Sequence, residues 1–358
     1  MSRSRLLTPV TFSATGLLVA TLLAATTAVA GEPERSVLVL TSTNDSAGNA
    51  VVVFKLDSAG TAALSYQDSL PTGGAGGAGT NAGILQFEHD RGAVANFGSN
   101  SVTELIREDD LVRIGATLKL ASGCVKPDSV ALTKDHLFVV GASCAETHAW
   151  PSGAPEGALV HLTDPSAAQI AVGSTWSAVT LTSGSVLQLP LAKDGTLSGA
   201  FIPITLPANA NNTPLGEAFW GAVLGFTPAH SPDSFAIVDE DRTVSPVTGP
   251  TPPYPTNAPC WVAKGRGNVW YTGNSPGQAI SIFFSDDHGG VFYKSVPLPG
   301  TPTDITVSHD GKWLALIYAA GDGAHVAVYS IDAYGGLTPA ATSAPVGAAA
   351  FSGVAFSD

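Results

Sequence analysis

The sequence predicts an all-β protein folded as a seven-bladed β-propeller with four-stranded antiparallel blades. Short alternating or apolar runs recur along the chain, separated by Gly, Asn, Asp and Pro, and no stretch keeps a helical period for more than a turn or two. A unit of Pro, apolar strand, charged or glycine turn and second apolar strand is repeated. Seven such units fill residues 31–358, or about 47 residues each, close to the ~40–50 residues of a propeller blade.

The repeated units differ in clarity. The clearest begin at Lys126 ("KPDSVALTKDHLFVVGASC"), Ala258 and Thr301, and weaker copies begin at Gly83, Gln169 and Phe219. The N-terminal copy from Ser36 lacks an innermost strand, and the tail "AAAFSGVAFSD" from Ala348 supplies one. We therefore expect both chain ends to close the first blade, which removes open sheet edges.

The first thirty residues have the pattern of an export signal. Arg3 and Arg5 give a positive start, residues 15–25 are apolar, and Ala28-Val29-Ala30 offers a cleavage point. The alternative is a membrane anchor, but the apolar run is shorter than the ~20 residues of a span. We expect a signal peptide at 1–30, one propeller domain at 31–358, and a periplasmic or extracellular location. No later stretch is a candidate span.

Three cysteines in an exported chain allow one disulfide and one free thiol. Cys124 and Cys144 flank two predicted strands, and an antiparallel hairpin would bring its two ends together. We predict that these two residues form a disulfide. Cys260 is then free, and we expect it to be buried as a small apolar residue.

The charge of the chain limits its partners. The formal net charge is −13, and the 16 Lys and Arg residues are scattered. An acidic surface repels nucleic acid and anionic membranes, and the lack of an Arg cluster argues against a phosphorylated substrate. The Gly-rich stretch from Thr72 lacks the Gly-Lys-Ser/Thr of a phosphate loop. We expect a monomer with a small-molecule ligand in the central channel.

Several segments together resemble a known family. They are "TSTNDSAGNAVVVFKLDSAGT", "ANFGSNSV", "KPDSVALTKDHLFVV", "NAPCWVA" and "PTDITVSHDGKWLALIY". The combination resembles the bacterial lactonase family of seven-bladed β-propellers, which has 6-phosphogluconolactonase-like and carboxymuconate-cyclising members. The resemblance implies lactone chemistry. It is a blade pattern that specifies the fold better than the reaction, and the blade from Phe219 matches poorly, so no catalytic set is carried over.

Candidate site residues follow from the expected surface of a propeller. The loops before each innermost strand and those between the second and third strands share one face, where ligands usually bind. Carboxylates there can act as a general base or hold a divalent cation, and the alternative role is to cap turns through local hydrogen bonds. The catalytic candidates are Asp128, Asp304 and Glu217. The substrate-binding candidates are Asn44, Asn100, Ser129, Trp261 and Asn274.

Histidines and metal motifs give weaker indications. His148 lies in an expected loop and is a candidate general base, with a surface histidine as the alternative. His89, His136 and His309 belong to turns of the opposite face and are discounted for catalysis. No G-x-S-x-G, H-E-x-x-H or C-x-x-C motif occurs. No cofactor is firmly implied, and a metal, if bound, is expected to be Ca²⁺ or Mg²⁺ held by oxygen ligands.

These observations favour an exported lactonase-like hydrolase that opens a small, non-phosphorylated lactone. The main alternative is a non-catalytic propeller that serves as a binding scaffold in the cell envelope, because propellers host unrelated functions. A third is a lyase or isomerase that closes a lactone, but the lack of an Arg cluster for a polycarboxylate counts against it.

Overall fold

The computed structural model describes residues 35–57, 63–79, 82–121, 123–231, 235–247, 258–286, 289–347 and 351–358. Within these ranges the regular elements are strands, apart from one short 3-10 turn, η1 (Phe97–Ser99). The expected signal peptide at residues 1–30 lies outside the described residues.

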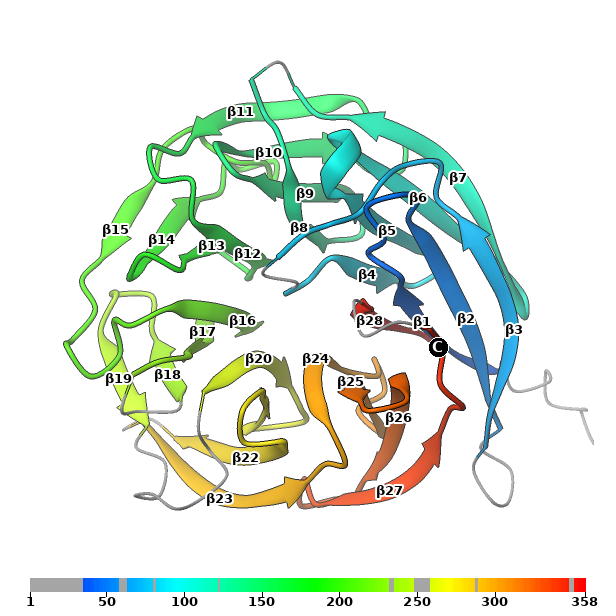
Figure 1. Cartoon of the computed structure of the whole chain (residues 1–358). Helices are drawn as coiled ribbons and strands as arrows, with labels where there is room; N and C mark the ends of the chain where they lie inside the picture. Colours follow the sequence, from blue (N-terminus) through cyan, green and yellow to red (C-terminus); the bar gives the residue numbers. More distant parts are fainter. Residues whose placement is uncertain are drawn as a thin grey trace, which may run out of the picture. The chain divides into compact units, whose positions relative to one another are not determined.

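The described strands form seven four-stranded antiparallel sheets, which are the seven blades (Figure 1). From the innermost strand outward, blade 1 contains β28 (Ser352–Ser357), β1 (Val37–Ser42), β2 (Ala50–Asp57) and β3 (Ala63–Pro71). Blade 2 contains β4 (Leu85–Glu88), β5 (Arg91–Asn96), β6 (Ser101–Glu108) and β7 (Leu111–Lys119). Blade 3 contains β8 (Pro127–Leu132), β9 (His136–Gly141), β10 (Cys144–Ala149) and β11 (Pro155–His161). Blade 4 contains β12 (Ala167–Val172), β13 (Trp176–Leu181), β14 (Ser185–Pro190) and β15 (Ile202–Ile204).

The remaining three blades repeat this arrangement. Blade 5 contains β16 (Pro214–Trp220), β17 (Val223–Pro228), β18 (Phe235–Val238) and β19 (Val244–Val247). Blade 6 contains β20 (Pro259–Lys264), β21 (Val269–Asn274), β22 (Ala279–Asp286) and β23 (Gly289–Pro297). Blade 7 contains β24 (Thr301–Val307), β25 (Trp313–Ala320), β26 (Gly323–Ile331) and β27 (Leu337–Thr342). The predicted fold class is confirmed.

The seven innermost strands surround a central channel. Each contacts its neighbours in the ring order β28, β4, β8, β12, β16, β20, β24 and back to β28, as Figure 1 shows. In blade 1 the C-terminal β28 pairs with the N-terminal β1, with Leu38 opposite Ser357 and Thr41 opposite Val354. The expectation that both ends close the first blade is thus confirmed, although residues 348–350 of the tail lie outside the described residues.

The core lies between adjacent blades, because each sheet packs on both of its faces. This explains why many strands read as continuous apolar runs rather than as a strict alternation. Phe235 of blade 5 packs against Trp270 and Phe283 of blade 6, with ring centroids 5.3 Å apart in each case. Trp270 is fully buried, so its truncation to Ala would cost about 3–5 kcal/mol.

A β-bulge marks the start of the innermost strand in blades 3 to 7. The register with the second strand shifts by one residue there. A bulge changes which face the following side chains point to. The first residues paired after the shift are Ser129, Gln169, Glu217, Trp261 and Asp304. All five are polar or carry a polar N–H group, and we call them the polar ring.

The cysteines behave largely as predicted. Cys124 and Cys144 form a disulfide, with Cα atoms 5.5 Å apart, across the β8–β9 hairpin. Cys260 is free, as expected, but it is half-buried rather than fully buried. Burial raises the pKa of its thiol to about 11, so the thiol is a poor nucleophile at neutral pH.

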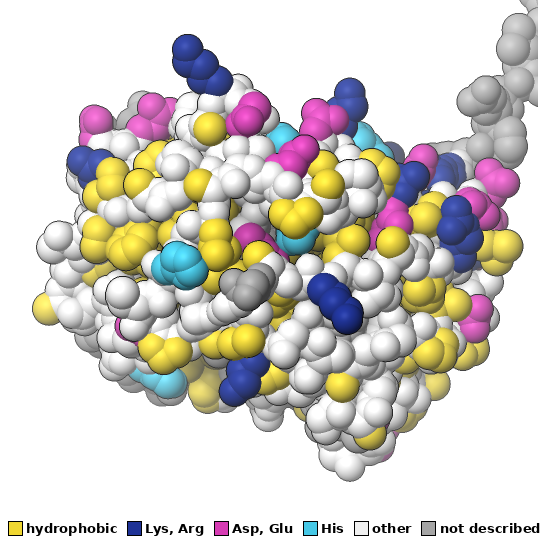
Figure 2. Space-filling view, turned by 90° about the horizontal axis from the view of Figure 1, so that it is seen from above, with side chains coloured by type: hydrophobic (Ala, Val, Ile, Leu, Met, Phe, Trp, Pro, Cys, Tyr) yellow, Lys and Arg dark blue, Asp and Glu magenta, His cyan; other side chains and the backbone are white. Residues whose placement is uncertain are grey.

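The surface agrees with the acidic composition. Lys and Arg side chains are dispersed over the face drawn in Figure 2 and do not gather into a patch. Among the described residues, no helix has the length and apolar character needed to cross a membrane.

Candidate functional site

A cavity of about 280 Å³ lies in the central channel, and residues from all seven innermost strands line it. This volume is near the lower limit of the ~300–1,000 Å³ that is typical of ligand pockets, so a ligand would be small. Four members of the polar ring contribute to its lining: Gln169, Glu217, Trp261 and Asp304.

The cavity extends towards the face formed by the turns between innermost and second strands. Along β24 its lining begins at Asp304, continues to Val307 and ends at His309, in the turn after the strand. The sequence had suggested the opposite face for the ligand. Because His309 lies on the cavity, the reason for discounting it does not hold.

Glu217 is the most unusual group in the cavity. The side-chain amide of Gln169 binds its backbone, since Gln169 Nε2 donates to Glu217 O (2.9 Å) and Glu217 N donates to Gln169 Oε1 (2.8 Å). The carboxyl group itself is 1% exposed at the residue level, and neither oxygen has a well-formed hydrogen bond among the described residues. Burial raises the pKa of Glu217 well above its usual value, and the nearby Ala171 amide offsets this only in part.

Asp304 is buried at the equivalent position of blade 7, and unlike Glu217 its carboxyl group accepts well-formed hydrogen bonds. Its Oδ1 accepts from the amide of Ile305 (2.8 Å) and its Oδ2 accepts from the amide of Val354 in blade 1 (2.9 Å). Burial raises the pKa of Asp304 to about 7, although the two amides act to lower it. Asp304 therefore connects two blades and titrates near neutral pH.

Trp261 lies on blade 6, between the blades that carry Glu217 and Asp304. It is 7% exposed and lines the cavity, and its indole N–H has no hydrogen-bond partner among the described residues. A buried N–H without a partner is costly unless a water or ligand accepts from it. Blades 5, 6 and 7 therefore present two carboxyl groups and one unused donor to the cavity.

Lys264 is the basic residue at the end of the same strand, β20. Its Nζ lies 5.0 Å from the ring centroid of Trp220 and 5.1 Å from that of Trp270, and it donates to the carbonyls of Gly265 (2.7 Å) and Gly267 (2.5 Å). Burial lowers the pKa of Lys264 to about 8. Lys264 lines the cavity, so it brings positive charge to one end of a site that also holds carboxyl groups.

The other predicted residues of blade 3 have structural surroundings. Ser129 links three blades, because its hydroxyl donates to Gly83 O (3.3 Å) and accepts from Ile170 N (3.2 Å). Asp128 is the bulged residue before it and is buried, and it does not line the cavity. The sequence aligned Ser129 with Trp261 and Asp304, which the strand register confirms.

The three predicted asparagines also serve the backbone. Asn44 accepts hydrogen bonds from the amides of Gly77 and Ala78, and Asn100 accepts one from the amide of Lys126. Asn274 is fully buried and bonds Ser281. None of the three lines the cavity.

His148 lies in strand β10, in contrast to the expected loop, and is buried. Its Nε2 lies 3.0 Å from Oε1 of Glu146 and its Nδ1 lies 3.0 Å from the carbonyl of Gly153. Burial acts to lower the pKa of His148, but the hydrogen bonds and the Glu146 charge together outweigh it and raise the pKa. His148 does not line the cavity, and its contacts are those of a structural ion pair.

Sequence reasoning missed several cavity residues, among them Gln169, Lys264 and His309. Gln169 could have been found by its position, because it stands where Ser129, Trp261 and Asp304 stand in their blades. A basic residue at the end of a buried strand, in a chain with few basic residues, was the available signal for Lys264.

Comparison with solved structures supports the architecture. The periplasmic gluconolactonase of Pseudomonas aeruginosa superposes with a TM-score of 0.63 over 90% of this chain and 98% of its own, at 15% identity. In fold, this chain resembles a gluconolactonase. A provisional 6-phosphogluconolactonase of Bacteroides fragilis gives a TM-score of 0.61 over 87% of this chain and 99% of its own, at 11% identity.

A different reaction occurs on a similar structure. A streptogramin B lyase superposes with a TM-score of 0.57 over 73% of this chain and 83% of its own, at 13% identity. No protein-family model and no curated protein matches the sequence. At these identities the similarity shows the fold, and the chemistry has to be argued from the cavity.

Proposed function

We propose that the protein is an exported lactonase-like hydrolase that opens a small, non-phosphorylated lactone in the central cavity. The observation that carries the proposal is the buried Glu217 carboxyl group, whose oxygens have no well-formed hydrogen bond although they lie in a cavity of ligand size. Buried polar groups without partners are rare and often mark functional positions.

Lactone opening needs one proton acceptor and one proton donor. Water attacks the carbonyl carbon while a base takes its proton, and cleavage of the ring C–O bond leaves an alkoxide that an acid protonates. Glu217, with its raised pKa, keeps a proton that it can give to the ring oxygen. The Trp261 N–H is free to donate to the carbonyl oxygen as negative charge develops there.

Asp304 is the proposed base. With a pKa of about 7, a substantial fraction of its carboxyl groups is ionised at neutral pH and accepts a proton from water. After one turnover Asp304 holds the proton from water and Glu217 has given one away. Proton exchange with solvent then restores both groups, and the product is a hydroxy acid.

The cavity favours an uncharged substrate. Among the described residues that line the cavity, Lys264 is the one Lys or Arg side chain, and its Nζ is already bound to two backbone carbonyls. A phosphate group normally requires several basic or amide donors. The ionised form of Asp304 would also repel it.

Export is supported by the disulfide between Cys124 and Cys144, because disulfides persist in oxidising compartments. The signal-like pattern of residues 1–30 is consistent with it. We propose that the protein acts as a monomer in the periplasm or outside the cell.

The test is hydrolysis of sugar lactones, aliphatic lactones and acyl-homoserine lactones, followed as acid release in a pH-stat. The variant Glu217→Gln should lower kcat by about 10²-fold or more on any lactone that is turned over. Glu240→Gln is the matched control, since Glu240 is exposed on a turn, and it should leave the rate unchanged. No turnover of any lactone, or equal rates for both variants, would contradict the proposal.

The alternative is a binding scaffold without catalysis. Gln169, Ser129 and Asp304 all take part in hydrogen bonds between blades. Such bonds are also expected if the polar ring only holds the blades together, which favours this alternative. A scaffold would bind a lactone or its hydroxy acid in calorimetry without releasing acid.

A further inference from the structure

Blade 1 differs from the other blades in the connection between its two innermost strands. In blades 2 to 7 a turn joins the innermost strand to the second strand, but in blade 1 these strands, β28 and β1, come from opposite ends of the propeller. No such turn therefore lies between the β4–β5 turn of blade 2 and the β24–β25 turn of blade 7. The two turns meet across this position.

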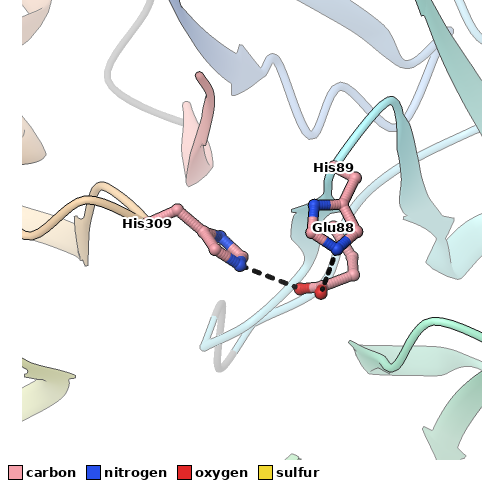
Figure 3. Close-up of side chains that lie close together, drawn as sticks. All are labelled: Glu88, His89 and His309. Carbon is pink, nitrogen blue, oxygen red and sulfur yellow. Dashed lines mark ion pairs between the residues drawn. The ribbon is translucent and has the colours of Figure 1, made fainter.

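Three side chains converge where these turns meet (Figure 3). Glu88 is the last residue of β4, His89 follows it in the turn, and His309 comes from the turn after β24. His89 Nε2 lies 3.5 Å from Glu88 Oε1, and His309 Nε2 lies 3.7 Å from Glu88 Oε2. The two imidazole rings have centroids 5.4 Å apart. We call Glu88, His89 and His309 the rim cluster.

The backbone explains how two adjacent residues can point to one place. Successive side chains of a strand point to opposite faces, so Glu88 and His89 would diverge if the strand continued. His89 has φ of 55°, in the left-handed region, which bends the chain at that residue.

The spacing of the rim cluster fits a small metal ion. One ligand atom from each residue can be chosen so that all lie within 4.8 Å of one another. Ligand atoms about 2.1 Å from a tetrahedral metal are roughly 3.4 Å apart. The distances from the two Glu88 oxygens to the histidines, 3.5 Å from Oε1 to His89 and 3.7 Å from Oε2 to His309, are close to that value.

The ligand types select the class of metal. Ca²⁺ and Mg²⁺ are held by oxygen atoms, whereas imidazole nitrogen suits zinc and other transition metals. Two imidazoles and one carboxylate form a common zinc ligand set, which leaves a fourth position for water or a substrate oxygen. The rim cluster therefore favours a different ion from the Ca²⁺ or Mg²⁺ that we expected from the sequence.

We propose that Glu88, His89 and His309 form a binding site for one divalent transition-metal ion, with zinc as the reference ion, at the rim of the central cavity. His309 lines the cavity, so the fourth coordination position lies near its entrance and can bind an oxygen of a ligand there. The site does not depend on lactone hydrolysis and would exist equally in a binding scaffold.

The test uses protein purified without a histidine tag and freed of metal by a chelator. Titration with ZnCl₂ in a calorimeter should show one tight site per chain, and Co²⁺ should give the visible absorption of a tetrahedral complex. His309→Ala, His89→Asn and Glu88→Gln should each weaken zinc binding by roughly tenfold or more, because even outer-shell partners of metal ligands are worth 10–100-fold. Asn is used at position 89 because it tolerates a positive φ.

His161→Ala is the matched control, since His161 is exposed at the end of β11, and it should bind zinc as the unaltered chain does. All four changes lie at exposed or partly exposed positions, so the melting temperature of each apo variant should stay close to that of the parent. The proposal is overturned if zinc does not bind, if the rim variants bind as tightly as the control, or if Glu217→Gln removes binding instead.

Discussion

Glu217 and Asp304 occupy the same position of blades 5 and 7, yet only Asp304 receives well-formed hydrogen bonds, from the amides of Ile305 and Val354. Both carboxyl groups are buried on the same cavity. The different number of donors separates their titrations, because hydrogen bonds to a carboxylate favour its ionised form. One group is thus suited to give a proton and the other to accept one.

The raised pKa of Glu217 should make stability fall as the pH rises. The folded chain keeps a proton on Glu217 that the unfolded chain releases above a pKa of about 4.5. The free energy of unfolding therefore falls with every increase of pH between the unfolded and the folded pKa. In Glu217→Gln this loss should disappear. Urea unfolding at pH 5 and pH 8 measures it, and an equal change of unfolding free energy in both proteins would refute the assignment.

The pH dependence of activity should report Asp304. If Asp304 is the base, kcat/KM should rise through a pKa of about 7 as its carboxyl group ionises, and level off above that. The plateau should end only where Glu217, the proposed acid, loses its proton. In Asp304→Asn the remaining activity should no longer rise near pH 7. If kcat/KM of the variant still rises near pH 7, the rise belongs to another group.

Gln169 should stabilise the ring more than an ordinary surface glutamine. Its side chain makes two hydrogen bonds to the buried backbone of Glu217, and Gln169→Ala leaves both backbone groups without partners. We expect a loss of about 2–4 kcal/mol in the free energy of unfolding. Gln67→Ala, at an exposed position of β3, should change it by less than about 0.5 kcal/mol.

The disulfide should be required for full stability. It closes a loop with a sequence separation of 20 residues, for which chain entropy predicts about 3 kcal/mol. The double variant Cys124→Ser and Cys144→Ser should lose about that amount in chemical denaturation. The reduced parent should behave like the double variant, and a much smaller loss in either would show that β8 and β9 hold the ends without the bond.

The fold could be predicted because its information is local and repeated. Strand pattern and turn residues recur in each blade. The N-terminal unit lacks one strand and the C-terminal tail contains one additional strand, so the sequence itself indicated how the first blade is completed. The disulfide followed from the hairpin between Cys124 and Cys144.

The site could be predicted only in part, because it depends on which side chains the bulge turns towards the channel. Asp304 and Trp261 were recognised from their alignment across blades, and Glu217 was named although the register of its blade was not settled by the sequence. Asp128 stands one residue earlier than the aligned position and does not line the cavity. Glu88 and His309 meet only because a turn is missing between them, and they are too far apart in sequence for any motif to link them.

The pairing of β1 with β28 also bears on when the protein can fold. Leu38 pairs with Ser357, which lies more than 300 residues later, so the ring cannot close until the chain has been made as far as β28. Contacts of such long sequence separation form slowly. A chain that stays open during synthesis is compatible with the proposed export in an unfolded form. Deletion of residues 352–358 should leave blade 1 without its innermost strand and the channel open on that side.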